Sequence, residues 1–560
     1  MTITTQDSVV VSLVRNAAAP LAMLSPALQL VFAVVALLGG WMLHNIALSP
    51  LSRYPGPLSA RLGIPFWRFW HSLSGDYAPA LLALHEHHGP AVRIGPTHLS
   101  FSDTSAVNSI YSLTDGTSSK FVKSHFYKSF QVFKAHPSIF SERDPHQHSK
   151  RRRAVASAYS MNSLVKLEEY VEAVSELLLK RLEEVVETNS VNRSKAGLDG
   201  DAVGTRPIKL DPWFHYFAMD VVGELAFGQS FNLLERGRDD ERFLTGVANL
   251  SQWGAVAGCL PLLSKWILWL FPRVTGQPGG SVIGDKTTSR IQTRYAEVEE
   301  SGGVQPRPDM LSKFMEARDP DSKERYSMKQ VLLIASSVMS AGSDTTATSL
   351  TTFFGYLLDN PQCYAKLRAE IDSAVEEGRL SAPVKYAKGA QLEYLQACIK
   401  ESLRLHPPIS MDLPRYVPAG GAVVGNRWAV PAGTTVGISP YVLHRNKEAF
   451  GHDADIFRPE RWLEGGEEGR KRLERFNMTF GGGSRACIGK NISLMELSKI
   501  IPEILMRFDI RKAANPSTST IPHSNATVKS RTPLPSFQGR SAWFLEAHDL
   551  YVELIPRGVL

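Results

Sequence analysis

The most apolar stretch of the chain lies close to its N-terminus. No Asp, Glu, Lys or Arg occurs between Arg15 and Arg53, and residues Ala27–Leu48 are mostly hydrophobic. Because a membrane-spanning helix needs about 20 apolar residues, this stretch predicts a transmembrane anchor. A cleaved signal peptide is the alternative, but it would place small residues after the apolar run, whereas Ala17–Ala19 precede it. We therefore expect the anchor to be retained.

The charges that flank the apolar stretch indicate how the chain is oriented. Arg53, Arg61 and Arg68 follow the stretch, and only Arg15 precedes it. Since positively charged residues favour the cytosolic side, we expect residues 1–26 to be luminal and the body to face the cytosol.

Proline and glycine mark the boundary between the anchor and the body. Tyr54-Pro55-Gly56-Pro57 has further prolines on both sides. Proline restricts the backbone and glycine allows a bend, so residues 49–65 are predicted to form a stiff hinge. Residues 66–560 would then form one globular domain.

Beyond the hinge, hydrophobic positions recur mostly with the period of an α-helix. Leu164–Val186 and Leu392–Leu405 show this spacing, and the second ends before Pro407. Residues 91–94 and 97–101 alternate around a Gly-Pro pair and predict a β-hairpin. The pattern indicates a mainly α-helical fold with a small β region.

The longest predicted helix runs from Met328 to about Asp359. Ser327 and Gln330 form a capping-box pattern before it, and Asn360-Pro361 stops it. Its middle, Ala341–Thr346, contains five weak helix formers. Such a local inconsistency tends to mark a functional site, although a kink without chemical consequence would look the same.

Composition limits the class of protein without identifying its function. Hydrophobic residues make up 43% and charged residues 21% of 560 residues, as in an ordinary globular protein with a core. The formal net charge of +7 occurs without a nucleic-acid-binding motif, so it suits anionic lipid or an acidic protein partner. The four cysteines show no Cys-x-x-Cys spacing, which argues against a zinc site or disulfide framework and favours a reducing compartment.

One cysteine lies on a glycine-rich loop. Phe480–Gly489 reads Phe-Gly-Gly-Gly-Ser-Arg-Ala-Cys-Ile-Gly, and a helix predicted over Asn491–Phe508 follows it. Glycines let the backbone approach a flat partner, and the N-terminus of a helix favours a thiolate. Cys487 therefore suits the axial ligand of a haem iron, a role in which a thiolate favours O–O cleavage. For an isolated cysteine, a buried free thiol on a turn would be the better interpretation.

Two further pairs have helical spacing. His148 and Arg152 are four residues apart, so both can donate to a carboxylate such as a haem propionate. Glu401 and Arg404 are three apart and can pair with each other. Pairs of this kind are common on protein surfaces, so the second pair alone indicates little.

The cysteine loop resembles the haem-binding signature of the cytochrome P450 family. That signature, Phe-x-x-Gly-x-Arg-x-Cys-x-Gly, is matched at every fixed position. Four motifs stand in the order typical of the family: Ala341–Thr346, Glu401–Arg404, Phe457–Trp462 and Phe480–Gly489. The resemblance covers roughly residues 54–509 and implies the cytochrome P450 fold. The chain is similar to microsomal class II members, especially fungal ones of secondary metabolism in the pisatin demethylase-like group.

The resemblance implies which residues bind the cofactor. Haem b would be bound by Cys487 as the iron ligand, in a loop that includes Phe480 and Gly489. Its propionates would be held by basic side chains: Arg152, Arg415, Arg485 and, where the family more often has Trp, His148.

The resemblance also implies the catalytic and structural residues. Asp344 and Thr345 would deliver the protons that O–O cleavage requires. Glu401, Arg404 and Arg461 would form a buried triad that stabilises the haem-binding core. Residues 409–413 would line the substrate pocket, in which Asp412 is an unusual charge unless it is exposed.

The implied function is monooxygenation of a lipophilic small molecule with O2 and NADPH-derived electrons. The electrons would arrive from NADPH-cytochrome P450 reductase through its flavins, with cytochrome b5 as a further candidate partner. The expected location is the endoplasmic reticulum membrane, and no nucleic acid is expected as a partner. A haem-thiolate isomerase or dehydratase that needs no reductase, and a non-catalytic haem or lipophile carrier, are the alternatives. The sequence does not identify the substrate.

Overall fold

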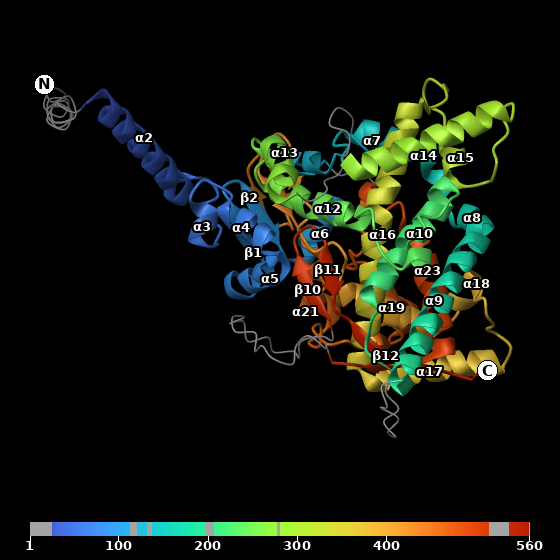
Figure 1. The fold of residues 1–560 in the computed structure, drawn as a ribbon. Helices are drawn as coiled ribbons and strands as arrows, with labels where there is room; N and C mark the ends of the chain where they lie inside the picture. The colour runs from blue at the N-terminus through green and yellow to red at the C-terminus, as the bar shows by residue number, and fades with distance from the viewer. Residues whose placement is uncertain are drawn as a thin grey trace, which may run out of the picture.

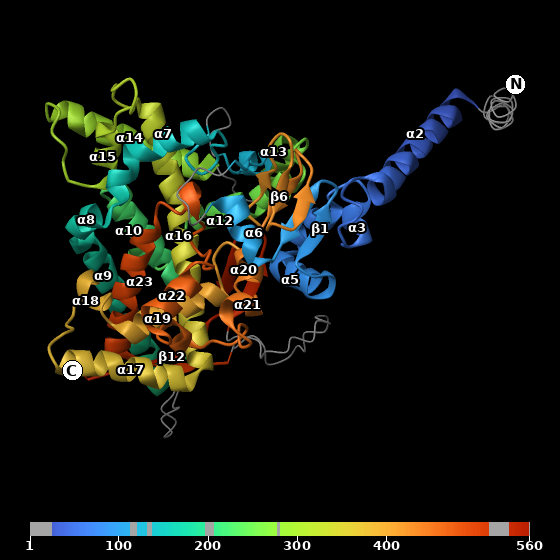
Figure 2. The same ribbon diagram turned by 180° about the vertical axis from the view of Figure 1, so that it is seen from behind.

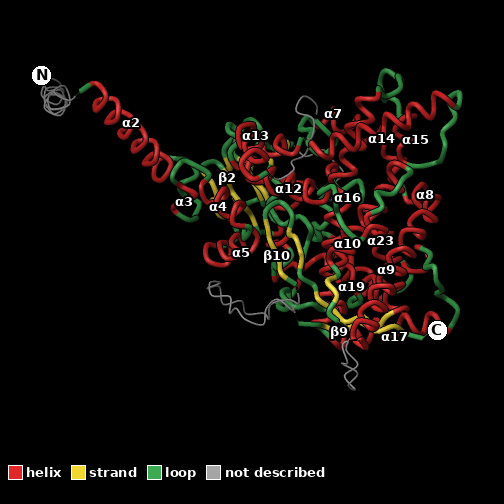
Figure 3. The backbone as a smooth tube through the Cα atoms, viewed as in Figure 1, coloured by secondary structure: helices red, strands yellow, loops and turns green. Residues whose placement is uncertain are grey.

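The fold is mostly helical, with one long helix through its middle. The computed structural model describes residues 25–112, 120–131, 137–195, 206–276, 281–514 and 537–558. Figures 1 and 2 show α16 (Met328–Asp359) inside a body of helices. Figure 3 shows that strands form only a small part of the backbone. The predicted fold class, mainly α with a small β region, is confirmed.

The longer helices besides α16 are α4 (Phe66–Ser74), α5 (Tyr77–His88), α6 (Thr104–Tyr111), α7 (Pro145–Val155), α9 (Glu168–Lys195), α10 (Asp211–Phe227), α12 (Phe243–Cys259), α13 (Ser264–Thr275), α14 (Ser281–Glu300), α15 (Met310–Glu316), α17 (Pro361–Glu376), α19 (Glu393–Leu405), α22 (Gly466–Glu474) and α23 (Lys490–Arg507). The short ones are α3 (Leu58–Arg61), α8 (Met161–Leu164), α11 (Leu233–Arg236), α18 (Tyr386–Gly389), α20 (Pro440–Leu443), α21 (Lys447–Phe450) and the 3₁₀ helices η2 (His125–Phe130), η3 (Ala156–Tyr159), η4 (Val165–Leu167), η5 (Pro459–Trp462) and η6 (Gly483–Arg485).

Within the described residues, the strands form four small sheets. The largest has the order β1 (Ala91–Gly95), β2 (His98–Phe101), β8 (Thr435–Gly437), β5 (Arg415–Tyr416), β3 (Val122–Lys123). The others pair β10 (Gln538–Ser541) with β11 (Leu545–His548), β6 (Ala422–Val424) with β7 (Trp428–Val430), and β4 (Ile208–Lys209) with β12 (Tyr551–Pro556) and β9 (Phe508–Lys512). Strands β1 and β2 pair antiparallel, so the predicted hairpin is confirmed.

The N-terminal helix stands apart from the body (Figures 1 and 2). α2 (Pro26–Leu43) continues through a π-helical segment, η1 (His44–Leu48), and no side chain of α2 is buried. The 23 residues Pro26–Leu48 are long and apolar enough to cross a membrane. At 1.5 Å per residue they span about 34 Å, which exceeds the ~30 Å of a bilayer's hydrocarbon core. Residues 1–24 of the predicted luminal segment lie outside the described residues.

The long helix has the bounds that the sequence predicts. Ser327 and Gln330 cap α16 reciprocally at its N-terminus, and Asn360 follows its last residue. The helix stays regular through its weak helix formers, so the predicted inconsistency produces no break. Packing explains this at Gly342, where an added Cβ would lie 2.5 Å from Cγ2 of Val222 on α10. Only a glycine allows the two helices to approach this closely.

Of two other predicted helices, the structure confirms one and divides the other. α19 begins one residue after the predicted start and ends at the predicted Leu405. The predicted helix Leu164–Val186 is divided, because residues 161–167 form the short helices α8 and η4 before α9 begins at Glu168 and continues to Lys195. The largest hydrophobic cluster surrounds α16 and α10, and it holds both helices against α19 and α23.

Candidate active site

The cysteine loop depends on glycine for its shape. Gly483 has a φ of +58°, and an added Cβ would lie 2.4 Å from the carbonyl oxygen of Tyr111. A larger residue would meet both backbone strain and a clash, so the loop requires glycine here. The amide of Cys487 donates to the carbonyl oxygen of Phe480 over 2.8 Å, which closes the loop and directs the cysteine inward.

A cavity of about 330 Å³ separates this loop from α16. Cys487, Phe480 and Gly489 line one side, and Ala341 and Thr345 of α16 line another. Much of the remaining wall is apolar, for example Phe130, Leu250, Ile409, Leu413, Trp543 and Phe544. The cavity therefore suits a ligand that is largely apolar.

The thiol of Cys487 faces this cavity. Its side chain is exposed to the interior space of the cavity, although protein surrounds it. Burial raises the pKa of the thiol, and donation from the amides of Gly489 and Lys490 and the charge of Arg152 oppose that increase. The sulfur also lies just before α23, whose N-terminus favours negative charge. These groups offset part of the effect of burial and favour the thiolate, the form that binds a metal, although the pKa stays above its usual value.

Basic side chains gather at the cavity without acidic partners in its wall. Lys123, His148, Arg152, Arg415 and Arg485 line the cavity, whereas no Asp or Glu of the described residues does. All four cationic groups donate to neutral oxygen atoms instead of carboxylates, and Lys123 Nζ does so to the Phe140 carbonyl over 2.5 Å. The bonds of the other three are Arg152 to the Ala486 carbonyl (2.7 Å), Arg415 to the Tyr127 hydroxyl (2.9 Å) and Arg485 to the Glu142 carbonyl (2.6 Å).

The pKa values show the cost of this arrangement. Burial and then the charge of Arg415 lower the pKa of Arg485 to about 10. Burial, together with the charges of Arg415 and Arg485, holds the pKa of Lys123 well below its usual value. Burial and Arg485 lower the pKa of His148 to about 3, so this imidazole is neutral and donates at most one hydrogen bond to a ligand. A bound anion would relieve the mutual repulsion of the cations.

These residues fit haem. The thiol would supply an iron ligand, the apolar walls would accommodate the porphyrin, and the cations would match its two propionates. Of the residues predicted to bind the cofactor, Cys487, Phe480, Gly489, Arg152, Arg415, Arg485 and His148 all line the same cavity.

The two predicted proton-handling residues lie on different sides of α16. Thr345 faces the cavity, and its hydroxyl donates to the carbonyl oxygen of Ala341 over 2.8 Å. Asp344 is buried but is not part of the cavity wall. Burial raises the pKa of Asp344, which favours the protonated acid.

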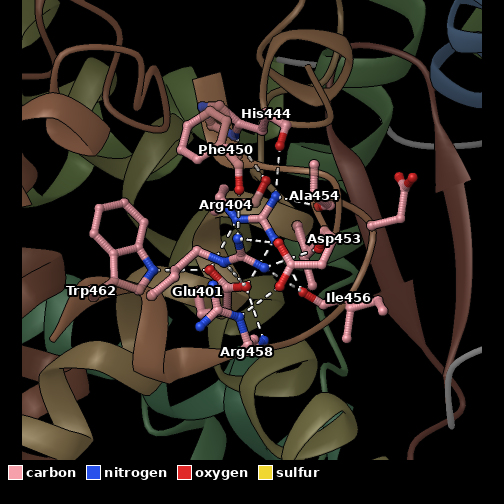
Figure 4. Close-up of polar contacts among 12 residues, drawn as sticks. Glu401, Arg404, His444, Phe450, Asp453, Ala454, Ile456, Arg458 and Trp462 are labelled. Carbon is pink, nitrogen blue, oxygen red and sulfur yellow. Dashed lines mark hydrogen bonds and ion pairs between the residues drawn. The ribbon is translucent and has the colours of Figure 1, made fainter. Parts of the chain in front are cut away.

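The predicted triad is assembled within a network of polar contacts (Figure 4). Arg404 donates to Glu401 through Nε (2.9 Å) and Nη2 (2.8 Å), and Arg461 donates through Nε (2.8 Å). Trp462 Nε1 and the Arg458 amide complete the shell around the Glu401 carboxylate at 2.9 Å and 3.0 Å. The three triad side chains are almost fully buried, so this is a buried ionic cluster, unlike the weak surface pair that the spacing alone suggests.

His444 connects this cluster to the cysteine loop. Its Nδ1 lies 2.8 Å from the carbonyl oxygen of Arg404, and its Nε2 accepts from the amide of Met478 over 2.8 Å. The carbonyl requires a proton on Nδ1 and the amide requires a lone pair on Nε2. Burial lowers the pKa of His444 to about 3, in agreement with this neutral tautomer.

The sequence suggested that Asp412 lines the pocket or is exposed, and both interpretations are wrong. Asp412 is fully buried and turns away from the cavity, between Ile409 and Leu413 in the chain. It accepts hydrogen bonds from the Tyr77 hydroxyl and, over 2.5 Å, from His98 Nε2. Burial alone would raise the pKa of Asp412. His98, Tyr77 and the nearby guanidinium of Arg68 outweigh burial and lower this pKa far below its usual range, which explains why a buried carboxylate stays charged.

Sequence reasoning missed several polar residues at the site. Lys123 lies in an aromatic-rich segment without any periodic signal. Glu496 accepts a hydrogen bond from Thr346, and the only clue was the second threonine of the Ala341–Thr346 segment. His215 lies near Asp344, but 129 residues earlier in the chain, so no local pattern could indicate it.

Comparison with known proteins agrees with this geometry. The sequence profile of the family "Cytochrome P450" matches residues 61–535. The chain is 37% identical to cytochrome P450 monooxygenase cicH of Emericella nidulans, covering 82% of this chain and 88% of that protein. It is 31% identical to pisatin demethylase of Fusarium vanettenii, covering 84% and 85% of the two chains. The crystal structure of the cytochrome P450DA heme domain aligns with a TM-score of 0.68 at 18% identity, over 90% of this chain and 98% of that one.

Proposed function

The chain belongs to the cytochrome P450 family and is an oxidoreductase of its monooxygenase class. We propose that it binds haem b through Cys487 and oxidises a lipophilic small molecule of fungal secondary metabolism. The observation that carries this proposal is the thiol of Cys487 in an apolar cavity whose wall also presents unpaired cationic side chains.

The cofactor would be held by the groups that surround the cavity. Cys487 would bind the iron as a thiolate, and the amides of Gly489 and Lys490 would donate to its sulfur. Arg152, Arg415, Arg485 and Lys123 would pair with the propionates, and neutral His148 would add one hydrogen bond. When bound, haem with a thiolate ligand activates O2 for insertion of an oxygen atom into the substrate.

Two residues of α16 would handle protons. Thr345 presents a hydroxyl that can donate or accept at the cavity, and it would release the Ala341 carbonyl to do so. Asp344 has a raised pKa and is the preceding residue of the helix, so it would hold a proton ready outside the cavity wall.

The cavity wall and the relatives support the class of substrate. The apolar wall near Ile409, Leu413 and Phe544 would exclude water and favour a lipophilic ligand. Relatives in the comparisons carry the names of fungal monooxygenases and of a demethylase. The proposal includes hydroxylation, epoxidation and demethylation, and the alternatives remain a haem-thiolate isomerase or dehydratase and a haem or lipophile carrier.

Location and partners follow from the same reasoning. The apolar helix Pro26–Leu48 would anchor the protein in the endoplasmic reticulum membrane, with the body in the cytosol. NADPH-cytochrome P450 reductase would supply electrons through its flavins, and cytochrome b5 would be a second donor. Turnover that consumes NADPH and O2 would exclude the isomerase and carrier alternatives.

The first experiment is the carbon monoxide difference spectrum of reduced membranes that contain the full chain. We expect the strongly red-shifted Soret band of a thiolate-ligated haem. Cys487→Ala should abolish this band, whereas Cys363→Ala, which changes a buried cysteine elsewhere, should retain it. A folded protein without a haem band, or an unchanged band in Cys487→Ala, would overturn the proposal.

A further inference from the structure

We propose that His215 of α10 passes protons from solvent to Asp344 of α16, and so forms the outer end of the proton route to the cavity. This inference rests on the proposed proton role of Asp344 and Thr345. It adds a residue of another helix, and it explains how a buried carboxyl group on the side of α16 away from the cavity exchanges protons with water.

The two side chains form a bridge between solvent and the buried carboxyl. His215 Nε2 lies 3.9 Å from Asp344 Oδ1, and 26% of the His215 side chain is exposed compared with 6% of Asp344. This distance exceeds that of a hydrogen bond, so the relay requires the two side chains to move closer together. The close approach of α10 to α16 at Val222 and Gly342 holds the two helices in this register.

The other ring nitrogen determines which proton can move. His215 Nδ1 lies 2.8 Å from the carbonyl oxygen of Asp211. A carbonyl only accepts, so Nδ1 carries a hydrogen in both the neutral and the charged ring. The neutral ring therefore presents a lone pair on Nε2 towards Asp344. One proton can lie either on Nε2, beside a carboxylate, or on Oδ1, beside a neutral imidazole.

The transfer conserves protons and charge. Water donates a proton to Nε2 of neutral His215, which gives imidazolium and leaves the base in solvent. The Nε2–H bond then breaks as an O–H bond forms on Asp344, which restores neutral imidazole and leaves a carboxylic acid. Asp344 then returns to a carboxylate by giving this proton to the hydroxyl oxygen of Thr345, the adjacent residue on the cavity side, while the Thr345 hydroxyl passes its own hydrogen to a basic oxygen atom of the ligand in the cavity.

Several polar and charged groups surround the pair. Burial raises the pKa of Asp344, while His215 and the hydroxyl of Ser343 (3.3 Å from Oδ1) lower it. From β11, Glu546 faces the same pair, and burial and then Asp344 raise its pKa to about 7. Arg540, directly opposite Glu546 on β10, opposes that increase.

Further charges act on the pair from α10 itself. The carboxylate of Asp211 interacts with His215, and burial raises its own pKa. His215 therefore interacts with three carboxyl groups of the described residues, Asp211, Asp344 and Glu546, and not with a single partner. If the role of His215 were merely structural, its replacement by a residue of fixed charge or by a neutral donor would not reduce activity. A relay, in contrast, requires a side chain that both accepts and donates a proton.

The first test uses the full-length holoenzyme with its reductase in lipid vesicles, without added substrate. We expect His215→Gln and His215→Arg to reduce NADPH oxidation roughly tenfold and to release more hydrogen peroxide per NADPH. The variants should also lose the pH dependence of the peroxide yield over the neutral range. His452→Gln, an exposed histidine elsewhere, is the matched control. Unchanged peroxide yield and pH profile in both His215 variants would overturn the inference.

The second test measures the histidine ring directly. In holoenzyme with ¹⁵N-labelled histidine, the His215 signals, assigned by their loss in His215→Gln, should show a proton on Nδ1 throughout the titration. Asp344→Asn should make Nε2 lose its proton at lower pH, because the carboxylate that favours imidazolium is gone. A titration unaffected by Asp344→Asn would contradict the coupling.

The two tests separate this inference from the proposed function. If Asp344→Asn changes the peroxide yield and the His215 variants do not, the inference alone is wrong. If Asp344→Asn has no effect either, the proposed proton role of Asp344 fails with it. A protein without the thiolate haem spectrum would refute the proposed function itself.

Discussion

Thr346 of α16 donates a hydrogen bond of 2.7 Å from Oγ1 to Oε2 of Glu496 on α23. The second carboxyl oxygen, Oε1, is buried and has no hydrogen-bond partner among the described residues. Burial raises the pKa of Glu496 to about 8, and the threonine lowers it only in part. At neutral pH the two helices beside the cavity are therefore joined through a protonated acid.

This pair predicts a pH-dependent stability. The folded state binds the Glu496 proton more tightly than the unfolded state, so the free energy of unfolding decreases by about 1.4 kcal/mol per pH unit between the unfolded and folded pKa values. Glu496→Gln lacks this ionisation. The difference in thermal midpoint between this variant and the wild type should therefore shift in favour of the variant as the pH rises from about 5.5 to about 7.5. Glu299→Gln, at an exposed position, is the control. A gap that stays constant with pH would contradict the buried acid.

Glu401→Gln should destabilise the haem-binding core strongly. The change leaves Arg404 and Arg461 buried without their carboxylate, which typically costs about 3–5 kcal/mol. The thermal midpoint and the haem content of purified protein should both fall. Glu467→Gln breaks an exposed pair with Lys471 on α22 and should change neither. Similar effects of the two substitutions would show that burial of the triad contributes nothing.

Lys123→Met should have opposite effects on the apoprotein and the holoprotein. Without an anion, loss of a buried cation next to Arg415 and Arg485 relieves repulsion, so the apoprotein should melt at a higher temperature. With haem, the same change removes a propionate partner, so transfer of haem to apomyoglobin should be roughly tenfold faster. Lys128→Met, at an exposed lysine of η2, is the control. Stabilisation of both forms would refute a propionate role.

Asp412→Asn should destabilise the segment that forms part of the cavity wall, although residue 412 does not itself line the cavity. The asparagine keeps the shape but removes the charge that Tyr77, His98 and Arg68 face, at an expected cost of about 3 kcal/mol or more. The thermal midpoint should fall, and affinity for bulky phenylimidazoles should fall more than affinity for imidazole. Asp455→Asn, near the surface, serves for comparison. Equal loss for both ligands would leave Asp412 a purely structural role.

Thr345→Ala should separate electron use from product formation. Without the hydroxyl at the cavity, more NADPH electrons should end in hydrogen peroxide, while the carbon monoxide spectrum should stay that of the wild type. Thr345→Ser retains a hydroxyl and should restore most of the coupling. Equal peroxide yields in the alanine and serine variants would exclude a role for this hydroxyl.

The sequence predicts the long elements and picks out the loop around Cys487 that lines the cavity, because their signals are local. Capping residues and a stopping proline define α16, and one ten-residue motif identifies the loop around Cys487. The start of α9 was missed because periodicity does not distinguish short helical turns from a continuous helix.

The remaining part of the site depends on contacts between distant segments. Lys123, His215 and Glu496 come from three elements far apart in the chain, and only the fold brings them to α16 or the cavity. Asp412 was misjudged because its donors, on α5 and β2, lie more than 300 residues earlier. Functional residues that belong to no sequence motif could therefore be identified only from the structure.

The hydrogen bonds around Glu401 have a consequence for the order in which the protein folds. The helix that carries Glu401 and Arg404 can form early from local contacts, but its carboxylate gains Arg461 and Trp462 only when residues 453–462 close over it. Until then the burial of that charge is unfavourable. Because His444 ties the same cluster to Met478, the cysteine loop should become ordered in the same cooperative step. Loss of haem would then report the opening of this unit before the rest of the protein unfolds.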